Sequence, residues 1–220
     1  MSCRVTPGGT GRRPLPAAGR APTADLVTRV AGVLGELALV RRDDGVLQLR
    51  VGGVLVMESD DDASEALLAV RGLPPGRGPL HVLVGGLGLG GTAARVLEDR
   101  RVHELVVVEV EPQLVGWARE GLLPVAARVL EDPRTRVVVG DVRHELARRA
   151  RARPAALDAV LLDVDNGPDQ LVTASNAALY REEALADAAA CVRPGGRVVV
   201  WSAVGGEEGG REGGKEGGGG

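Results

Sequence analysis

Residues 82–92 read VLVGGLGLGGT, and residues 93–98 continue as AARVLE. An apolar, β-branched run therefore ends in alternating glycines, which lead into a stretch that favours helix. This order predicts a strand, a tight turn and a helix. Glycine is expected in such a turn because some turn positions need a positive φ, and because a side chain would keep the backbone away from a ligand. The free N–H groups at the start of the helix would face that ligand.

The sequence after the glycine turn (residues 86–91) contains a carboxylate at the spacing expected of a ribose-binding acid. Glu109 ends the apolar run 105–108, LVVV, and an acid roughly 20 residues after such glycines usually binds ribose hydroxyls. Taken alone, the glycines could form a bare strand-to-helix turn, and Glu109 could be a solvated strand end. Together they predict a site for a cofactor that carries a nucleoside.

The rest of the C-terminal half alternates between apolar runs and helix-like segments. Strands are predicted near residues 81–85, 104–109, 135–139, 158–163 and 196–202. Helices are predicted near residues 91–100, 112–121, 142–151 and 177–191. The Pro-Gly-Gly at 194–196 is expected to end the last helix. Because the strands are almost wholly apolar, they indicate an α/β fold with a doubly wound, mostly parallel sheet that helices cover on both faces.

A small antiparallel β unit is predicted before this domain. Short strands at 36–41, 46–51 and 54–57 are separated by turn residues, and a helix over 63–70 follows the acidic run 60–62. The predicted organisation is a disordered leader (1–22), the β unit with its helix (35–72), the nucleoside-binding α/β domain (79–203) and a disordered Gly/Glu tail (204–220).

Composition excludes several classes of function. The 220 residues carry a formal net charge of −3, which gives no case for nucleic-acid binding. No apolar run approaches the roughly 18 residues of a membrane span. Cys3 and Cys191 form neither a disulfide framework nor a metal spacing, so a reducing cytoplasm is expected. The three histidines show no ligand spacing, so no metal is expected.

Several motifs together resemble the spermidine synthase (polyamine aminopropyltransferase) family, within the methyltransferase-like fold that S-adenosylmethionine-dependent enzymes use. These motifs are GLGLGG (86–91), EVEP (109–112), GD (140–141), LDVDNGP (162–168), PGG (194–196) and VVVW (198–201). The preceding antiparallel unit is similar to the small N-terminal β domain of that family. The resemblance covers roughly residues 35–203.

The resemblance implies a binding role for several residues. Glu109 would hold the ribose hydroxyls, and Asp141, with the backbone of Val142, would meet the adenine edge. The thioether end of the nucleoside would be wrapped by three turn glycines: Gly86, Gly88 and Gly90. The co-substrate would be decarboxylated S-adenosylmethionine, or S-adenosylmethionine itself, and the partner a small-molecule amine. The family often forms dimers, so a homodimer is implied.

A carboxylate is also needed for the chemistry. An amine with a pKa near 10 is protonated at neutral pH, and removing that proton costs about 4 kcal/mol. Asp163 matches the catalytic aspartate of the family, and Asp165 lies in the same loop, so either could accept the proton and orient the amine. The alternative interpretation is that both residues cap a helix or stabilise the loop.

The family motifs, and the positions at which this sequence differs from them, leave three candidate functions. The first is aminopropyl transfer from decarboxylated S-adenosylmethionine to an amine, as in polyamine biosynthesis. Leu89 stands where the family usually has an aspartate that holds the cationic aminopropyl end, and losing one partner of a buried ion pair costs about 3–5 kcal/mol. Leu89 therefore favours the second candidate, an S-adenosylmethionine-dependent methyltransferase. Residues 65–67 read EAL instead of the polyamine-facing Tyr, Gln or His, and Glu of the family. The third candidate is a catalytically inactive nucleoside-binding remnant.

Overall fold

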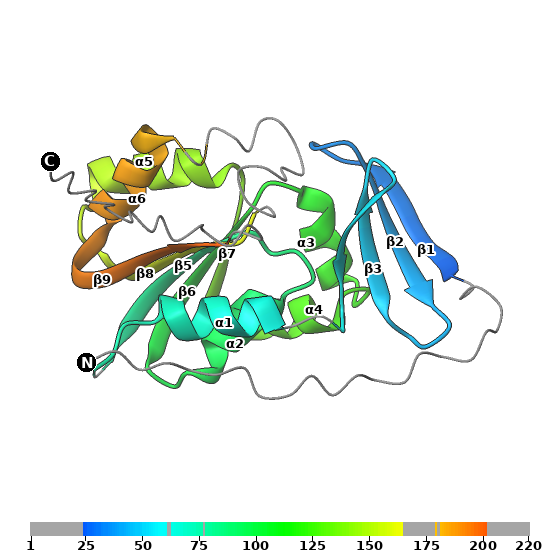
Figure 1. The fold of residues 1–220 in the computed structure, drawn as a ribbon, viewed down its shortest axis with the longest axis horizontal. Coiled ribbons are helices and arrows are strands. Elements are labelled where there is room, and N and C mark those ends of the chain that lie inside the picture. The colour runs from blue at the N-terminus through cyan, green and yellow to red at the C-terminus, as the bar shows by residue number, and fades with distance from the viewer. Residues whose placement is uncertain (1–23, 61–62, 77, 165–178, 180, 202–220) are drawn as a thin grey trace, which may run out of the picture.

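Two sheets organise the protein in a computed structural model (Figure 1). The structure describes residues 24–60, 63–76, 78–164, 179 and 181–201. One sheet has four antiparallel strands, and the other has five parallel strands with helices on both faces. This arrangement confirms the predicted α/β fold preceded by a small antiparallel unit. The predicted leader (1–22) and tail (204–220), and part of the acidic run (60–62), lie outside the described residues.

The antiparallel sheet is a meander in which each strand pairs with the next along the chain. Its strands are β1 (Ala24–Ala31), β2 (Glu36–Arg42), β3 (Leu47–Val51) and β4 (Val54–Glu58). The turn between β3 and β4 consists of Gly52 and Gly53, with φ of +57° and +83°. Positive φ at both central positions matches the right-handed twist of the flanking strands, which explains the paired glycines.

The parallel sheet has the strand order β7-β6-β5-β8-β9. The strands are β5 (Leu80–Gly85), β6 (Val102–Glu109), β7 (Thr135–Val139), β8 (Leu157–Leu162) and β9 (Val192–Val200). The chain first adds strands on one side of β5 and then returns to add β8 and β9 on the other. This reversal creates a topological switch point between β5 and β8, where ligands of open α/β sheets bind at the carboxyl ends of the strands.

Helices cover both faces of the parallel sheet (Figure 1). On one face lie α1 (Ala63–Gly72), α2 (Gly91–Glu98) and α4 (Pro124–Glu131), and on the other lie α5 (Val142–Ala152) and α6 (Glu182–Cys191). The helix α3 (Pro112–Arg119) lies next to the antiparallel sheet. In the part of the chain that is described, no helix is long and apolar enough to cross a membrane.

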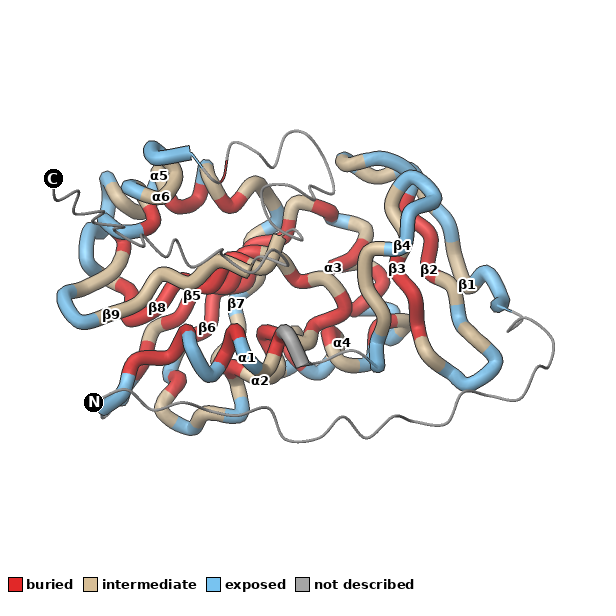
Figure 2. Tube along the Cα trace, viewed as in Figure 1, coloured by how far each residue is buried: buried red, intermediate tan, exposed pale blue. Residues whose placement is uncertain are grey.

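Two apolar clusters form the core, one on each face of the parallel sheet. Val82 and Val84 belong to one cluster and Leu83 to the other, as the alternation of side chains along a strand requires. β8 is buried along its whole length, and β5 is buried at every position except the half-buried His81 (Figure 2). The first cluster also takes in leucines of the antiparallel sheet, namely Leu37, Leu39, Leu47 and Leu49. The two sheets are therefore joined by one continuous core.

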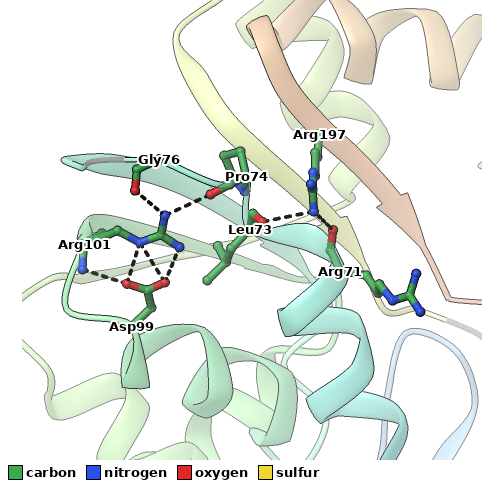
Figure 3. Close-up of polar contacts among 7 residues, drawn as sticks. All are labelled: Arg71, Leu73, Pro74, Gly76, Asp99, Arg101 and Arg197. Atoms are coloured by element: carbon green, nitrogen blue, oxygen red, sulfur yellow. Dashed lines mark hydrogen bonds and ion pairs between the residues drawn. The ribbon is translucent and has the colours of Figure 1, made fainter. Parts of the chain in front are cut away.

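Arginines fix the connection between α1 and β5 at the amino end of the parallel sheet (Figure 3). The Arg101 guanidinium donates to the carbonyls of Pro74 (3.0 Å) and Gly76 (2.8 Å). It is itself held by the Asp99 carboxylate at 2.6 Å. The guanidinium of Arg197, on β9, donates to two carbonyls at the end of α1, those of Arg71 and Leu73.

The structure differs from the predicted elements in four respects. Strand β1 and helix α4 were not predicted. The helix expected over 177–191 begins at Glu182 in the structure, and residues 177, 178 and 180 lie outside the described part. The Pro-Gly-Gly at 194–196 does not end this helix, which stops at Cys191 and passes directly into β9.

A shift in strand register explains where the Pro-Gly-Gly lies. Leu157 of β8 pairs with Val192, but Ala159, two residues later, pairs with Arg197. The additional residues of β9 must therefore bulge out of the ladder. Proline and glycine suit such a position because proline has no N–H to donate and glycine adopts the φ of +85° found at Gly195.

Candidate active site

The switch point brings the predicted site residues together. At the carboxyl end of β5, the Gly86 N–H donates to the carbonyl of Val108 (2.8 Å), the residue before Glu109. On the other side, the Asp163 N–H donates to the carbonyl of Gly85 (2.8 Å). These bonds continue the parallel ladder past the ends of the strands. As a result, the glycine turn lies between Glu109 on one side and Asp163 on the other.

The glycine turn is closely packed on its outer sides. Gly86 has a φ of +97°, and a Cβ there would overlap the carbonyl oxygen of Asp163. Gly90 has a φ of +101°, and a Cβ there would lie 2.5 Å from the backbone nitrogen of Ala126 in α4. Both positions therefore require glycine for two reasons, conformation and space. At Gly88 the nearest atom to a Cβ would be the sulfur of Met57, at 2.6 Å, so β4 approaches the turn from the antiparallel sheet.

Glu109 points at the glycine turn. Its side chain is 5% exposed. Oε2 accepts the N–H of Leu87 (2.7 Å), and Oε1 accepts the N–H of Glu111 (2.8 Å). Burial raises the pKa of the Glu109 carboxyl above its usual value, although the backbone N–H groups of Glu111 and Leu87 act in the opposite direction. The predicted proximity of the turn and this acid is therefore present in the structure.

Asp141 and Val142 lie at the start of α5, after the neighbouring strand β7. Asp141 caps the helix, since Oδ1 accepts the N–H of Arg143 (2.8 Å), and its carboxylate also pairs with the Arg143 guanidinium. Burial raises the pKa of Asp141, but the bonds from Arg143 outweigh it and hold this pKa below its usual value. The Val142 side chain packs in the core. The backbone N–H of Val142 lies in the first turn of α5, where N–H groups have no hydrogen-bond partner inside the helix.

Asp163 has a partner that the sequence analysis missed. The Thr92 hydroxyl donates to Asp163 Oδ2 at 2.5 Å. Thr92 is 3% exposed and lies in the first turn of α2, directly after the glycines. Burial raises the pKa of Asp163, and the bond from Thr92 lowers it. The sequence signal that could have indicated this contact is the hydroxyl residue directly after the glycine turn, because the start of that helix faces the carboxyl edge of the sheet. Asp165 lies outside the described residues.

Leu89 and Glu65, two positions at which the sequence differs from the family that it resembles, lie in different environments. Leu89 is 8% exposed and belongs to the first apolar cluster, so the turn residue that replaces an acid packs into the core. Glu65 of α1 is equally buried, and its Oε1 would lie 2.9 Å from a Cβ on Gly91. A carboxylate from α1 therefore lies against the start of α2, close to the turn that contains Leu89.

Glu111 also has a role that the sequence did not indicate. The sequence predicts no site role for Glu111, which precedes α3 as its N-cap residue. Its side chain makes no cap bond, however. Instead its carboxylate accepts the N–H groups of Val33 (2.9 Å) and Leu34 (2.6 Å), which lie in the turn between β1 and β2.

Together, the switch point, the glycine turn and the acid after β6 define an α/β domain of the methyltransferase-like class. The described residues contain no group of three or more His, Cys, Asp or Glu side chains placed to hold a metal ion.

Comparisons with known proteins show which members of this class the chain is similar to. No family model matches the chain. The chain is 33% identical over 165 residues to a polyamine aminopropyltransferase of Mycobacterium tuberculosis. This match covers 75% of the chain and 30% of the relative. It is 33% identical over 161 residues to polyamine aminopropyltransferase 2 of Pseudomonas aeruginosa, 71% of this chain and 43% of the relative. An Aeropyrum pernix polyamine aminopropyltransferase is 31% identical over 170 residues, 77% of this chain and 52% of the relative.

Solved structures agree in fold. The spermidine synthase of Thermotoga maritima superimposes with a TM-score of 0.62 at 20% identity, over 77% of this chain and 54% of that one. A spermidine synthase in complex with the transition-state analogue AdoDATO gives a TM-score of 0.61 at 19% identity, over 77% of this chain and 55% of that one. The resemblance to the spermidine synthase family is thereby confirmed. The matched region spans between about a third and a half of the length of these curated relatives.

Proposed function

We propose that this chain transfers an aminopropyl group from decarboxylated S-adenosylmethionine to a small-molecule amine, as in polyamine biosynthesis. The observation that carries the proposal is the arrangement at the switch point: a glycine turn lies between a ribose-type acid, Glu109, and a buried aspartate, Asp163. The similarity to polyamine aminopropyltransferases supports the same reaction.

The nucleoside would be bound by groups at the carboxyl ends of three strands. An ionised carboxylate offers about four lone-pair sites; on Glu109 the N–H groups of Leu87 and Glu111 occupy two of them, and the Gly88 N–H is also directed at the carboxylate. The remaining sites would accept ribose hydroxyls. Asp141 would likewise accept from the adenine amino group, and the Val142 N–H would donate to a ring nitrogen. The glycines of the turn, Gly86, Gly88 and Gly90, would allow the thioether end to approach the backbone.

Asp163 would serve as the base. The amine nitrogen attacks the aminopropyl carbon bonded to the sulfonium, the carbon–sulfur bond breaks, and its electron pair stays on sulfur, which leaves as a neutral thioether. The proton of the amine goes to a carboxylate. Burial raises the pKa of Asp163, which makes it a stronger base than an exposed aspartate, while the Thr92 bond keeps the carboxylate oriented. Asp165 stays a second candidate for this role.

One observation favours the alternative, methyl transfer from S-adenosylmethionine. Leu89 lies in the apolar core, so the turn offers no carboxylate at this position to a cationic aminopropyl group. In the aminopropyl reaction, Glu65 would have to supply the missing negative charge, and its position beside Gly91 supports that role.

Calorimetric titration distinguishes these functions. We expect decarboxylated S-adenosylmethionine and 5′-methylthioadenosine to bind, and S-adenosylmethionine to bind more weakly. Tighter binding of S-adenosylmethionine would reject aminopropyl transfer in favour of methyl transfer. If the nucleosides bind but decarboxylated S-adenosylmethionine incubated with putrescine yields no 5′-methylthioadenosine, aminopropyl transfer to putrescine is rejected, which supports the inactive nucleoside-binding remnant. If none binds, the proposal fails.

A further inference from the structure

Two backbone N–H groups hold the Glu109 carboxylate, and only one of them lies in the glycine turn of the proposed nucleoside site. Its Oε2 is held by the Leu87 N–H in the glycine turn, and its Oε1 by the N–H of Glu111. A carboxylate with both oxygens bonded cannot rotate freely about its terminal torsion, which is otherwise broad. The orientation of Glu109 therefore depends on where the backbone of Glu111 lies.

The position of Glu111 is set in turn by the antiparallel sheet. Its carboxylate, 2% exposed, accepts the N–H groups of Val33 and Leu34 from the turn between β1 and β2. The same turn is closed by the Gly32 N–H, which donates to the carbonyl of Gly35 (2.8 Å). Two successive backbone N–H groups around one carboxylate form a small anion-binding concavity.

Gly32 shows how closely the turn fits this carboxylate. A Cβ on Gly32 would lie 2.6 Å from Glu111 Oε2 and 2.9 Å from its Cδ. Its φ lies outside the left-handed region, so alanine could adopt the backbone conformation there. The three atoms nearest to such a Cβ all belong to Glu111, so the space taken by this side chain favours glycine at position 32.

We propose that Glu111 is a positioning residue that transmits the placement of the 32–35 turn to Glu109, so that the antiparallel sheet sets the geometry of the ribose-binding acid. The proposal rests on the ribose role assigned to Glu109 above. It assigns no contact between Glu111 and the substrate. Its consequence is that a change in the β1–β2 turn, which belongs to the other sheet, alters nucleoside affinity.

The first test perturbs the contact from each side and measures the Kd of 5′-methylthioadenosine by calorimetry. Glu111→Gln removes the charge and turns an amide N–H₂ toward one of the two backbone donors. Gly32→Ala pushes the carboxylate away without altering residues 109–111. Hydrogen bonds to charged groups contribute enough that we expect each variant to raise the Kd about tenfold.

Two matched variants control for a general loss of stability. Asp158→Asn alters another buried carboxylate that accepts a backbone N–H, that of His81 at the amino end of the sheet. Gly116→Ala adds a Cβ in α3, where nothing lies within 4 Å of it. Both should leave the Kd unchanged, whatever they do to the melting temperature. If Asp158→Asn raises the Kd as much as Glu111→Gln, the effect is general and the proposal is overturned.

A double-mutant cycle separates this proposal from the function on which it rests. Glu109→Gln alone should raise the Kd, and adding Glu111→Gln should raise it less than twofold further, because Glu111 acts through Glu109. If the two effects multiply in full, Glu111 does not act through Glu109 and the inference is wrong. If Glu109→Gln leaves the Kd unchanged, the ribose assignment fails instead.

Discussion

The bond between Thr92 and Asp163 shows how one side chain can tune another from a distant part of the sequence. Asp163 follows β8 and Thr92 opens α2, and the two meet because both adjoin the switch point. Neither residue type is unusual by itself. Their effect on each other exists only because β5 and β8 are neighbours in the sheet.

Replacing Thr92 by valine should change the pH dependence of turnover. The hydroxyl bond lowers the pKa of Asp163, so its removal raises that pKa and reduces the ionised fraction at a given acidic pH. The acidic limb of kcat/KM should therefore move to higher pH. Thr92→Ser, which keeps the hydroxyl, should retain the parent profile. The measurement is a pH–rate profile of all three proteins, and identical limbs would argue against Asp163 as the base.

Asp163→Asn should separate catalysis from stability. Turnover should fall by at least about a hundredfold, the usual contribution of a positioned base. Burial raises the pKa of Asp163 in the folded state, so stability decreases as pH rises above the ordinary value of 3.8 and through the raised value. Asparagine cannot ionise, so the variant should melt at the same or a higher temperature at pH 7. Scanning calorimetry checks this, and a lower melting temperature would mean that the Asp163 charge is structurally required.

At the scale of the element, the predictions from sequence were most reliable where strands are buried on both faces. β5, β6 and β8 were recognised because continuous apolar runs end in glycine or acidic residues. β1 was missed because none of its residues is buried, so its sequence shows no alternation of apolar and polar residues. α4 was missed although it spans eight residues without a side-chain cap bond, as the predicted helices α2 and α3 also do.

The connection between α1 and β5 offers a test at this scale. Arg101→Ala removes two bonds to the carbonyls of Pro74 and Gly76, so the free energy of unfolding should fall by about 1–2 kcal/mol. Arg100→Ala, at the exposed neighbouring position, should change it by less than about 0.5 kcal/mol. Urea denaturation of the two variants makes the comparison. Equal losses would mean that Arg101 contributes only as a surface charge.

For the whole molecule, the shared core predicts that the two sheets unfold together. Leu39 of β2 and Trp117 of α3 belong to one apolar cluster. Leu39→Ala should therefore cost about 2–5 kcal/mol and lower the stability of the entire described chain. Tryptophan fluorescence and far-ultraviolet circular dichroism should give coincident transitions in both proteins. A separate early transition in Leu39→Ala would show that the antiparallel sheet is an independent unit.

The site was predictable from sequence only in part, for a reason that applies to the whole molecule. The glycine turn and Glu109 are close in sequence and joined by one strand–helix–strand unit, so their proximity follows from local rules. The contact from Val33 and Leu34 to Glu111 joins two sheets, and no local pattern indicates it. Leu89 could be read as a missing charge, but only the packed core shows where its side chain goes.

The continuous core also has a consequence for biosynthesis. The leucines of β2 and β3 leave the ribosome well before the α3 residues of the same cluster, which include Leu114 and Trp117. Until that helix has been translated, the apolar face of the nascent meander lacks the part of its cover that α3 supplies. Chaperones that bind exposed apolar segments would therefore meet this chain at an early, defined stage of its translation.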